Sequence, residues 1–562
     1  MDGLARRGVR FDRAYATAPV TLPSHASLLS GRYPPGHGAR DNGMRVDEKV
    51  PLIAETLAKQ GFVTGAFVAA FPLDKRFGLN RGFATYGDRL PRMTDGRPSN
   101  ERPGRVVVDE ALDWLRQRTA DGARRFFLWV HLFEPHTPYG NAADPAQGSR
   151  PASARYDDEI AEADRQIARL IDALGADTAS TIVVVAADHG EAFGEHGEIG
   201  HSVFIYDTTL RVPLLIAGPN VPAGRVIQDP VALTDVAPTM LRMLGVQGFD
   251  ADGIDLAPAF DGTSLPTREL YAETFAPLLD FGWSALRSIR SGGWKYIAAP
   301  TRELYDTTRD AAEDRNVVEA ESRRAATLAD RVERYSGPEL SAAVTQDPEV
   351  ASRLRSLGYA GGNSRGGSTS RPDPKDRREL AARIARVASG ELRGAALESA
   401  LEEILRADPE NPQANLRLGY VLLESNRCGR AVRHFQAAVN GRLPGAEAHL
   451  GLAACAAREK RLEAAIRALE QGQRAEPESP LVAANLGVVL SDGGEPARSL
   501  PHFERALRLD ADFHQARFNL AVAYARLGRR ADAAAQAREL LSRMPANAPQ
   551  RPEIERLLAA VQ

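Results

Sequence analysis

Three segments of the sequence carry side chains suited to the chemistry of phosphate or sulfate esters. In the first, Thr21 stands where an extended segment meets a helix that Pro23 can begin at its first turn. Backbone N–H groups at a helix N-terminus bind anions, so an attacked phosphate or sulfate group could be held beside the Thr21 hydroxyl. A threonine before a helix is usually only a cap, and this segment alone leaves both interpretations open.

The second segment follows the apolar run 181–187, which predicts a buried strand. Asp188 and His189 come directly after it, at the end of a parallel strand, where open α/β sheets build their sites. A carboxylate beside an imidazole suits a divalent metal, with zinc or manganese favoured and calcium or magnesium as alternatives. His196 and His201 follow in the same stretch.

The third segment repeats this arrangement. The strand predicted at 126–131 ends in His131, and His136 lies between two prolines, which indicates a rigid loop over a pocket. A single histidine is more often a structural hydrogen-bonding residue than a ligand. The prediction of a site therefore depends on three strand ends that supply a threonine, histidines and an Asp-His pair to one edge of a sheet.

An α/β domain is needed to position these side chains. From residue 1 to about 340, short apolar runs alternate with amphipathic stretches, as expected for a mostly parallel sheet between helices. Apolar residues at helical spacing predict a helix over 158–175. Buried strands are predicted at 63–68, 126–131, 181–187 and 213–217. We therefore expect a catalytic-type domain at 1–340.

A second domain is predicted after a linker at 341–376. Residues 356–375 are rich in glycine, serine and proline and bury too little apolar surface to become ordered. Over 377–562 similar residues recur every 34 positions, as at Leu418, Leu452, Leu486 and Leu520. This period resembles that of tetratricopeptide repeats, which implies an all-α solenoid with a groove for a protein partner. An ordinary helical bundle is the alternative.

The composition limits the possible functions. The chain has 562 residues, too many for one hydrophobic core, and its formal net charge of -3 lacks the basic excess of nucleic-acid-binding proteins. We therefore expect no nucleic-acid partner. Neither Cys428 nor Cys455 has a spacing that would hold zinc. No apolar run is long enough to predict a membrane span in the chain as given.

Longer stretches resemble the sulfatase branch of the alkaline phosphatase superfamily, over about residues 1–316. The segment from Thr21 to Pro34 is similar to the family's Cys-x-Pro-Ser-Arg signature and the helix after it. Residues 126–139 resemble its substrate-side histidine loop, and residues 188–191 resemble its metal strand. Later similar segments are 210–216, 234–241 and 293–306. The resemblance implies an α/β enzyme that acts on phosphate or sulfate esters.

Departures from the sulfatase pattern favour phosphate esters. Sulfatases oxidise a cysteine or serine to formylglycine, and Thr21 cannot become that aldehyde because its β-carbon carries a methyl group. His25 replaces the signature arginine, and His201 stands where sulfatases commonly carry a lysine. Threonine nucleophiles occur in the phospho-transfer branches of the superfamily. Asp188 and His189, followed by His201, resemble the pattern of phosphoethanolamine transferases.

The resemblance implies a role for each candidate residue. Thr21 would attack phosphorus as a metal-bound alkoxide, with Asp188 and His189 holding the cation. His136 and His201 would bind a non-bridging oxygen, protonate the leaving group or hold a second metal. The residues expected to contact the ester substrate are His25, Asn42, His131 and His196. Turn formation would explain Asn42 equally well.

Family members begin with an apolar strand that ends in acidic metal ligands, and the resemblance in this chain starts after that strand. Loss of a central strand would remove ladder hydrogen bonds and leave a cation with about three protein ligands. We therefore expect a misassigned start at Met1 or a fragment of a longer chain. A true start at Met1 implies a cytoplasmic protein, whereas a missing segment implies a periplasmic or membrane-anchored one.

Three functions remain open at this point. The first is a metal-dependent hydrolase or transferase of phosphate or sulfate esters, with Thr21 as nucleophile and repeats that bind a protein partner. The second is a conventional sulfuric ester hydrolase. The third is an inactive sulfatase-like scaffold whose repeats bind protein.

Overall fold

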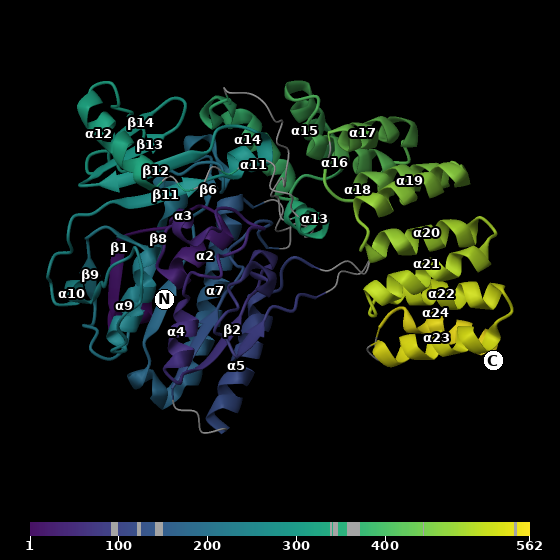
Figure 1. Ribbon diagram of the computed structural model, residues 1–562, viewed down its shortest axis with the longest axis horizontal. Coiled ribbons are helices and arrows are strands. Elements are labelled where there is room, and N and C mark those ends of the chain that lie inside the picture. The colour runs from purple at the N-terminus through teal and green to yellow at the C-terminus, as the bar shows by residue number, and fades with distance from the viewer. Residues whose placement is uncertain are drawn as a thin grey trace.

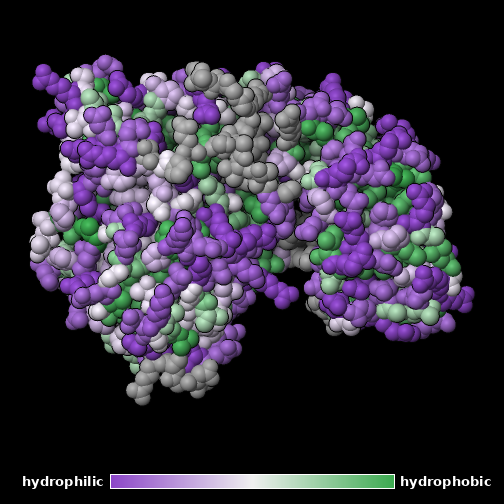
Figure 2. Space-filling view, viewed as in Figure 1, coloured by the Kyte–Doolittle hydropathy of each residue, from purple (hydrophilic) through white to green (hydrophobic). Residues whose placement is uncertain are grey.

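The structure is a computed structural model of the chain. It describes residues 1–91, 99–120, 125–140, 150–335, 337, 340, 347–356, 371–441, 443–544 and 548–562. An α/β part, coloured purple to teal in Figure 1, is followed by a curved array of helices that ends at the C-terminus. On the face shown in Figure 2, hydrophilic residues predominate over both parts, and hydrophobic residues form small scattered groups.

The largest sheet of the α/β part has the order β10-β1-β8-β5, with β9 also paired to β1. β1 is parallel to β9 and β10, whereas β8 is antiparallel to both β1 and β5. The α/β class is confirmed, but this sheet is mixed rather than mostly parallel. The sequence could not predict this difference, because side-chain alternation is the same for both strand directions. Its strands are β1 (Val9–Tyr15), β5 (Val183–Ala186), β8 (Arg211–Ala217), β9 (Arg225–Ile227) and β10 (Val231–Ala232).

A second sheet is fully parallel, with the order β3-β2-β4. Its strands are β2 (Val63–Phe67), β3 (Thr85–Gly87) and β4 (Phe126–Val130), and α5 (Gly104–Ala120) packs against it. Close approach of this helix requires a glycine, since a Cβ on Gly65 would lie 2.7 Å from the Trp114 ring. Phe67, Val107 and Trp114 form the core between helix and sheet.

Strands β5 and β4, each at an edge of its sheet, end near the candidate site. Among the strands that the structure describes, β5 pairs only with β8 and β4 pairs only with β2. All four residues of β5 are half-buried. The long helix α7 (Ala152–Leu174) matches the predicted helix, yet of its apolar residues only Ala163 is buried. The two edges and α7 therefore keep part of their apolar surface accessible.

The remaining strands form an antiparallel sheet and a short pair. The sheet has the order β11-β12-β13-β14, and α12 (Ser322–Val332) packs on it. Its strands are β11 (Leu270–Thr274), β12 (Leu286–Ser291), β13 (Trp294–Ala298) and β14 (Glu303–Asp306), and the pair consists of β6 (Ala192–Phe193) and β7 (Ile199–Gly200).

Short helices complete the α/β part. They are α1 (Asp2–Arg7), α2 (Thr21–Ser30), α3 (Pro34–His37), α4 (Ile53–Lys59), α8 (Asp207–Leu210), α9 (Val236–Met243), α10 (Ala257–Phe260) and α11 (Ala276–Phe281). Short 3-10 segments are η1 (Phe71–Leu73), η2 (Lys75–Phe77), η3 (Gly175–Ser180), η4 (Glu195–Gly197), η5 (Leu233–Asp235) and η6 (Glu333–Tyr335).

The predicted linker contains ordered elements. α13 (Pro348–Ser356) packs against η1, and η7 (Pro374–Arg377) precedes the helical array. Residues 357–370, the centre of the predicted flexible stretch, lie outside the described residues. Within 341–376, the described segments therefore include one helix docked on the α/β part.

The C-terminal array consists of successive packed helices. They are α14 (Arg378–Ala388), α15 (Gly394–Ala407), α16 (Pro412–Glu424), α17 (Cys428–Asn440), α18 (Glu447–Arg458), α19 (Leu462–Ala475), α20 (Pro480–Asp492), α21 (Pro496–Leu509), α22 (His514–Arg526), α23 (Arg530–Arg543) and α24 (Arg551–Val561). The 34-residue period reflects a repeated contact: Phe435 packs against Gly419, and Phe503 packs against Gly487. None of the described helices combines the length and apolar character needed to cross a membrane.

Candidate active site

The site is built around the start of α2. Val20 is extended, and Thr21 is the first helical residue, with 7% of its surface exposed. The Oδ1 of Asn42 accepts a hydrogen bond from the Leu22 N–H at 2.9 Å. Asn42 thereby satisfies one of the N–H groups that a helix start leaves without a partner, a contact between segments that the sequence does not reveal.

His25 and Ser24 connect this helix to the end of β5. The Nδ1 of His25 lies 2.8 Å from the carbonyl oxygen of Thr21 and 3.4 Å from Oδ2 of Asp188. The Ser24 hydroxyl donates a hydrogen bond to the Asp188 carbonyl oxygen. The first turn of α2 and the Asp188-His189 pair therefore meet at one place. Ser24 was not among the predicted site residues, because a short buried serine has no distinctive pattern.

Four further histidines gather around Asp188 and His25. The Nε2 of His189 lies 3.5 Å from Oδ2 of Asp188, and the ring centres of His189 and His201 are 4.0 Å apart. The His136 ring centre lies 5.6 Å from that of His201. His131 is 5.0 Å from His25, measured between ring centres. The structure thus brings together side chains from α2 and from the segments that follow β4, β5 and β7.

Hydrogen bonds to the backbone assign the tautomers of these rings. His25, His136, His189 and His201 each place Nδ1 within 3.0 Å of a backbone carbonyl oxygen, which makes Nδ1 the protonated nitrogen. In this tautomer the lone pair of a neutral ring lies on Nε2. His131 differs, since its Nδ1 accepts the Ala69 N–H at 3.2 Å and its Nε2 carries the proton.

The electrostatics favour neutral imidazoles around a charged carboxylate. Burial lowers the pKa of His131 to about 3 and that of His136 to about 4, and it lowers the pKa of His25 and His201 as well. Burial alone would raise the pKa of Asp188, but the imidazoles around it bring it below its ordinary value. At neutral pH these four imidazoles are thus uncharged, and the Asp188 carboxylate carries a negative charge.

Glu159, on α7, holds the His136 loop. Its carboxylate accepts hydrogen bonds from the backbone N–H groups of His136, at 3.0 Å, and Gly140, at 2.5 Å. The sequence pattern assigned this helix only a packing role, because the partners of Glu159 are backbone groups in another segment. Glu159 therefore fixes a loop whose rigidity the sequence had suggested only through its prolines.

His196 lies apart from the other histidines. Its ring stacks on Tyr206, with ring centres 3.7 Å apart, and its Nε2 donates to the Ala312 carbonyl oxygen at 2.9 Å. The backbone of His196 is left-handed, with a φ of +52°. These contacts lie away from Asp188 and Thr21, so the structure does not bring this predicted substrate residue to the site.

The side chains that could bind a divalent cation do not form a complete set of ligands. Asp188 and His189 are conventional ligands, and Thr21 adds a hydroxyl. Within the ranges that the structure describes, no group of three or more His, Cys, Asp or Glu side chains is arranged to hold a metal. These residues could therefore provide some of the ligands of a metal site but not a complete set.

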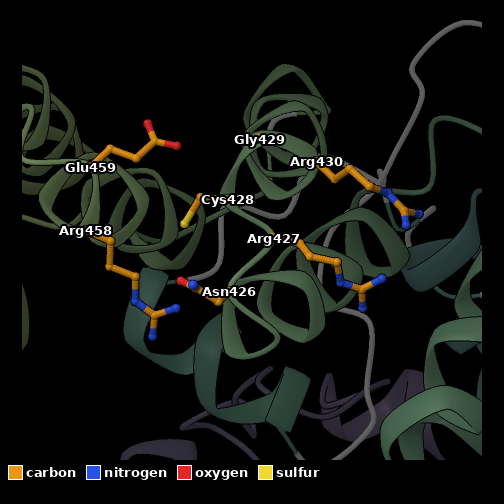
Figure 3. Close-up of a pocket in the computed structure, with 7 residues that line it drawn as sticks. All are labelled: Asn426, Arg427, Cys428, Gly429, Arg430, Arg458 and Glu459. Atoms are coloured by element: carbon orange, nitrogen blue, oxygen red, sulfur yellow. The ribbon is translucent and has the colours of Figure 1, made fainter.

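A separate hollow of about 420 Å³ lies in the repeats, at the turn between α16 and α17 (Figure 3). Its arginines already serve the packing of the helices: Arg427 and Arg430 pair with Glu398, and Arg458 donates to the Leu423 carbonyl oxygen. This hollow is not connected with the histidine cluster by any lining residue.

Family models match both parts of the chain. Residues 1–246 match the sulfatase family, and residues 384–445, 416–480 and 485–552 match the tetratricopeptide repeat. Nearly all of the site residues described above fall within the first match. The second match covers the helices that repeat with the 34-residue period.

Relatives agree with these matches. A choline-sulfatase of Rhizobium meliloti (strain 1021) is 24% identical over 406 residues, which cover 57% of this chain and 77% of that protein. An arylsulfatase K of Xenopus laevis is 26% identical over 329 residues, covering 46% of this chain and 61% of that protein. The solved structure of Ps i-CgsB has the same fold, with a TM-score of 0.52, 22% identity, and coverage of 63% of this chain and 90% of that one. Residues 1–246 therefore form a sulfatase-like domain, similar to ester hydrolases of that family, and the chain continues into a series of tetratricopeptide repeats.

Proposed function

We propose that the sulfatase-family domain cleaves phosphate esters, by hydrolysis or by transfer to an acceptor, with Thr21 as the nucleophile. The observation that carries this proposal is the position of His25, whose Nδ1 lies within 3.4 Å of both the Thr21 carbonyl oxygen and the Asp188 carboxylate. Thr21, the Asp188 carboxylate and several imidazoles then lie in one region. That combination supports a two-step displacement.

In the first step the Thr21 oxygen bonds to phosphorus and the bond from phosphorus to the leaving oxygen breaks. The Thr21 proton passes to the Nε2 of His136 or His201, and from there to the leaving alkoxide. In the second step the same nitrogen takes a proton from water or an acceptor alcohol, whose oxygen bonds to phosphorus as the bond from phosphorus to Thr21 breaks. The nitrogen then returns this proton to the Thr21 oxygen and restores the hydroxyl. His131, with its proton on Nε2, is suited to donate to a non-bridging oxygen.

A divalent cation would use Asp188 and His189, and zinc or manganese fits their chemistry best, with calcium or magnesium as alternatives. When bound, such a cation would neutralise charge on the ester and increase the acidity of a nearby hydroxyl. Because the donor set is incomplete, the two steps above use only the protein's own groups. Metal content per chain, measured for the wild type and for Asp188→Asn, tests this assignment without an activity assay.

Phosphate is preferred to sulfate because the Thr21 β-carbon bears a methyl group and cannot yield formylglycine. A conventional sulfuric ester hydrolase is the second candidate, and the names of the relatives favour it. A non-catalytic scaffold is the third, and the incomplete donor set favours it. In each case, we propose that the repeats bind a protein partner.

The deciding experiment is an activity panel on the full chain with added divalent ions. Nitrophenyl phosphate, bis-nitrophenyl phosphate and nitrophenyl sulfate are compared for the wild type, Thr21→Ala and the control Thr56→Ala, which changes a helical threonine outside the site. The proposal expects turnover of a phosphate ester that Thr21→Ala abolishes and Thr56→Ala preserves. Turnover of the sulfate alone would support the second candidate, and no turnover would support the scaffold.

A further inference from the structure

α14, the first helix after the linker, belongs to two hydrophobic cores. Ala381 is buried in the main core of the α/β part. Val387 is buried in the core of the first repeat helices, and Leu380 packs against both clusters. The repeats are thus joined to the α/β part by a shared helix.

The same helix packs against the loop that leads to His201. α14 contacts η4 and β7, the two short elements that precede this histidine. Gly197, in η4, has a φ of +77°, and a Cβ added there would lie 3.2 Å from Cβ and 3.3 Å from Cδ of Arg378. The aliphatic part of Arg378 therefore lies directly beneath the turn at Gly197.

The guanidinium of Arg378 fixes the neighbouring aromatic residues. It donates a hydrogen bond to the Tyr206 hydroxyl at 2.9 Å and lies 5.7 Å from the centre of the Phe204 ring. The Tyr206 hydroxyl donates in turn to the Glu303 carboxylate at 3.1 Å. His196 also stacks on the Tyr206 ring. The loop from η4 to β7 thus packs against Arg378 and against the aromatic residues that Arg378 contacts.

The opposite end of the loop is fixed at the site. The Nδ1 of His201 donates to the Pro19 carbonyl oxygen at 2.9 Å, just before α2. The carbonyl oxygen of Ser202 accepts a hydrogen bond from Thr274 at 2.5 Å. A shift of the Arg378 end would therefore be transmitted along a short, tethered segment to the His201 ring.

We propose that Arg378 is a positioning residue: it supports the Gly197 turn and holds Tyr206, and so sets the location of His201. This proposal rests on the proposed role of His201 in ester cleavage. It makes the first helix of the repeat region a structural part of the active site. A partner that moves α14 would then change turnover without touching the substrate.

Kinetics on the full chain test the proposal, with the ester that the wild type cleaves best. Arg378→Ala is expected to lower kcat by ~10–100-fold with a smaller change in KM, because a displaced catalytic group costs turnover more than binding. Arg378→Lys keeps the aliphatic stem and a charge and is expected to recover most of the rate. Arg383→Ala, on the same helix with ion pairs to Glu379 and Glu403, is the control and is expected to match the wild type.

A double-mutant cycle with His201→Ala decides whether the effect passes through that residue. Arg378→Ala is expected to have little further effect in the His201→Ala background, since coupled residues are not additive. An equal loss in both backgrounds, or wild-type kcat in folded Arg378→Ala, would overturn the proposal. If Arg378→Ala does not fold, Arg378→Met takes its place in the cycle, because it keeps the stem and loses the bond to Tyr206.

A second readout separates this inference from the proposed function. The imidazole NMR signals of His201, assigned by their loss in His201→Ala, are compared between the wild type, Arg378→Ala and Arg383→Ala. They are expected to shift only in Arg378→Ala, whether or not an ester is turned over. Unchanged signals in Arg378→Ala would refute the positioning role, whereas absence of ester turnover with shifted signals would refute only the proposed function.

Discussion

The histidines around Asp188 differ in the nitrogen that carries the proton, and this difference defines their chemistry. Four of them donate from Nδ1 to backbone carbonyl groups, and His131 alone is held as an Nε2–H donor by the Ala69 N–H. Four rings that can accept a proton at Nε2 and one ring that can donate from Nε2 therefore surround the Asp188 carboxylate. Hydrogen bonds to the backbone, and not solvent, maintain these tautomers.

Sequence reasoning anticipated some of these residues and missed others for an identifiable reason. Thr21, Asp188 and His201 were found because strand ends and a helix start have recognisable patterns. Ser24 and Glu159 were missed, since both act on backbone groups of distant segments that no spacing reveals. The catalytic roles themselves remain predictions.

At the residue scale, Ser24→Ala is predicted to destabilise the protein and reduce ester turnover. The change leaves the part-buried Asp188 carbonyl oxygen without the Ser24 hydroxyl, which costs ~1–3 kcal/mol of unfolding free energy. Chemical denaturation and initial rates measure both effects. Ser542→Ala, which removes an exposed hydroxyl bonded within its own helix, is the control. Equal stability of the two variants would contradict the assigned contact.

Among the secondary-structure elements, the loop from η4 to β7 has an unusual buried acid. The Oε1 of Glu198 accepts hydrogen bonds from the N–H groups of Val203 at 2.9 Å and Phe204 at 3.1 Å. Burial is the main cause that raises the pKa of this carboxyl to about 8. The folded state therefore holds a proton that the unfolded chain releases above its ordinary pKa of 4.5.

This shift predicts a pH-dependent stability. Its contribution is complete below about pH 4.5 and is lost as the pH rises towards 8, because the unfolded chain ionises first. Glu198→Gln keeps an acceptor and cannot ionise, so it is expected to melt near the wild-type temperature at low pH and higher at pH above 8. Thermal melts across this range measure the difference. If Glu198→Gln and the exposed control Glu319→Gln differ from the wild type by the same amount at every pH, the prediction is wrong.

The repeat helices offer a matched pair of glycine substitutions. A Cβ at Gly487 would lie 2.6 Å from the Phe503 ring, whereas a Cβ at Gly429 meets nothing within 4 Å. Gly487→Ala is expected to cost ~1–3 kcal/mol through overpacking. Gly429→Ala is expected to be neutral or stabilising, because alanine favours a helix. Chemical denaturation of the two variants measures the difference. If Gly487→Ala is no less stable than Gly429→Ala, the repeated Gly–Phe contact is contradicted.

The element pattern could be predicted well from the sequence, but strand direction could not. The runs at 63–68 and 126–131 became β2 and β4, and the 34-residue period became the helical array. The antiparallel direction of β8 was missed because a buried strand has the same composition in either direction. α13 was missed because it lies beside a glycine-rich stretch and is stabilised by packing on two partners.

For the whole molecule, α13 joins the α/β part to the repeats. On one side, the guanidinium of Arg353 lies 3.7 Å from the centre of the Phe71 ring. On the other, Arg355 forms an ion pair with Glu447 of α18, to which Ser352 also donates at 2.8 Å. The Arg355 side chain is only 3% exposed, so this pair is shielded from solvent.

Glu447→Ala is predicted to release α13 from the repeats. It leaves the buried Arg355 guanidinium without its carboxylate, which costs ~3–5 kcal/mol. Hydrogen exchange in residues 347–356 should become faster, as measured by mass spectrometry. The control Glu539→Ala breaks an exposed pair within α23 and should leave this segment unchanged. Unaltered exchange of α13 in Glu447→Ala would show that the pair does not hold the two parts together.

The most direct test of the account is to trap the covalent intermediate. Full-length protein is mixed with a phosphodiester, quenched in acid within one turnover, digested and analysed by mass spectrometry. We predict a phosphoryl adduct on the Thr21 hydroxyl that disappears in Thr21→Ala and persists longer in His201→Ala. Turnover of the phosphodiester with an unmodified Thr21 peptide at every quench time, or with an adduct on another residue, would contradict the account.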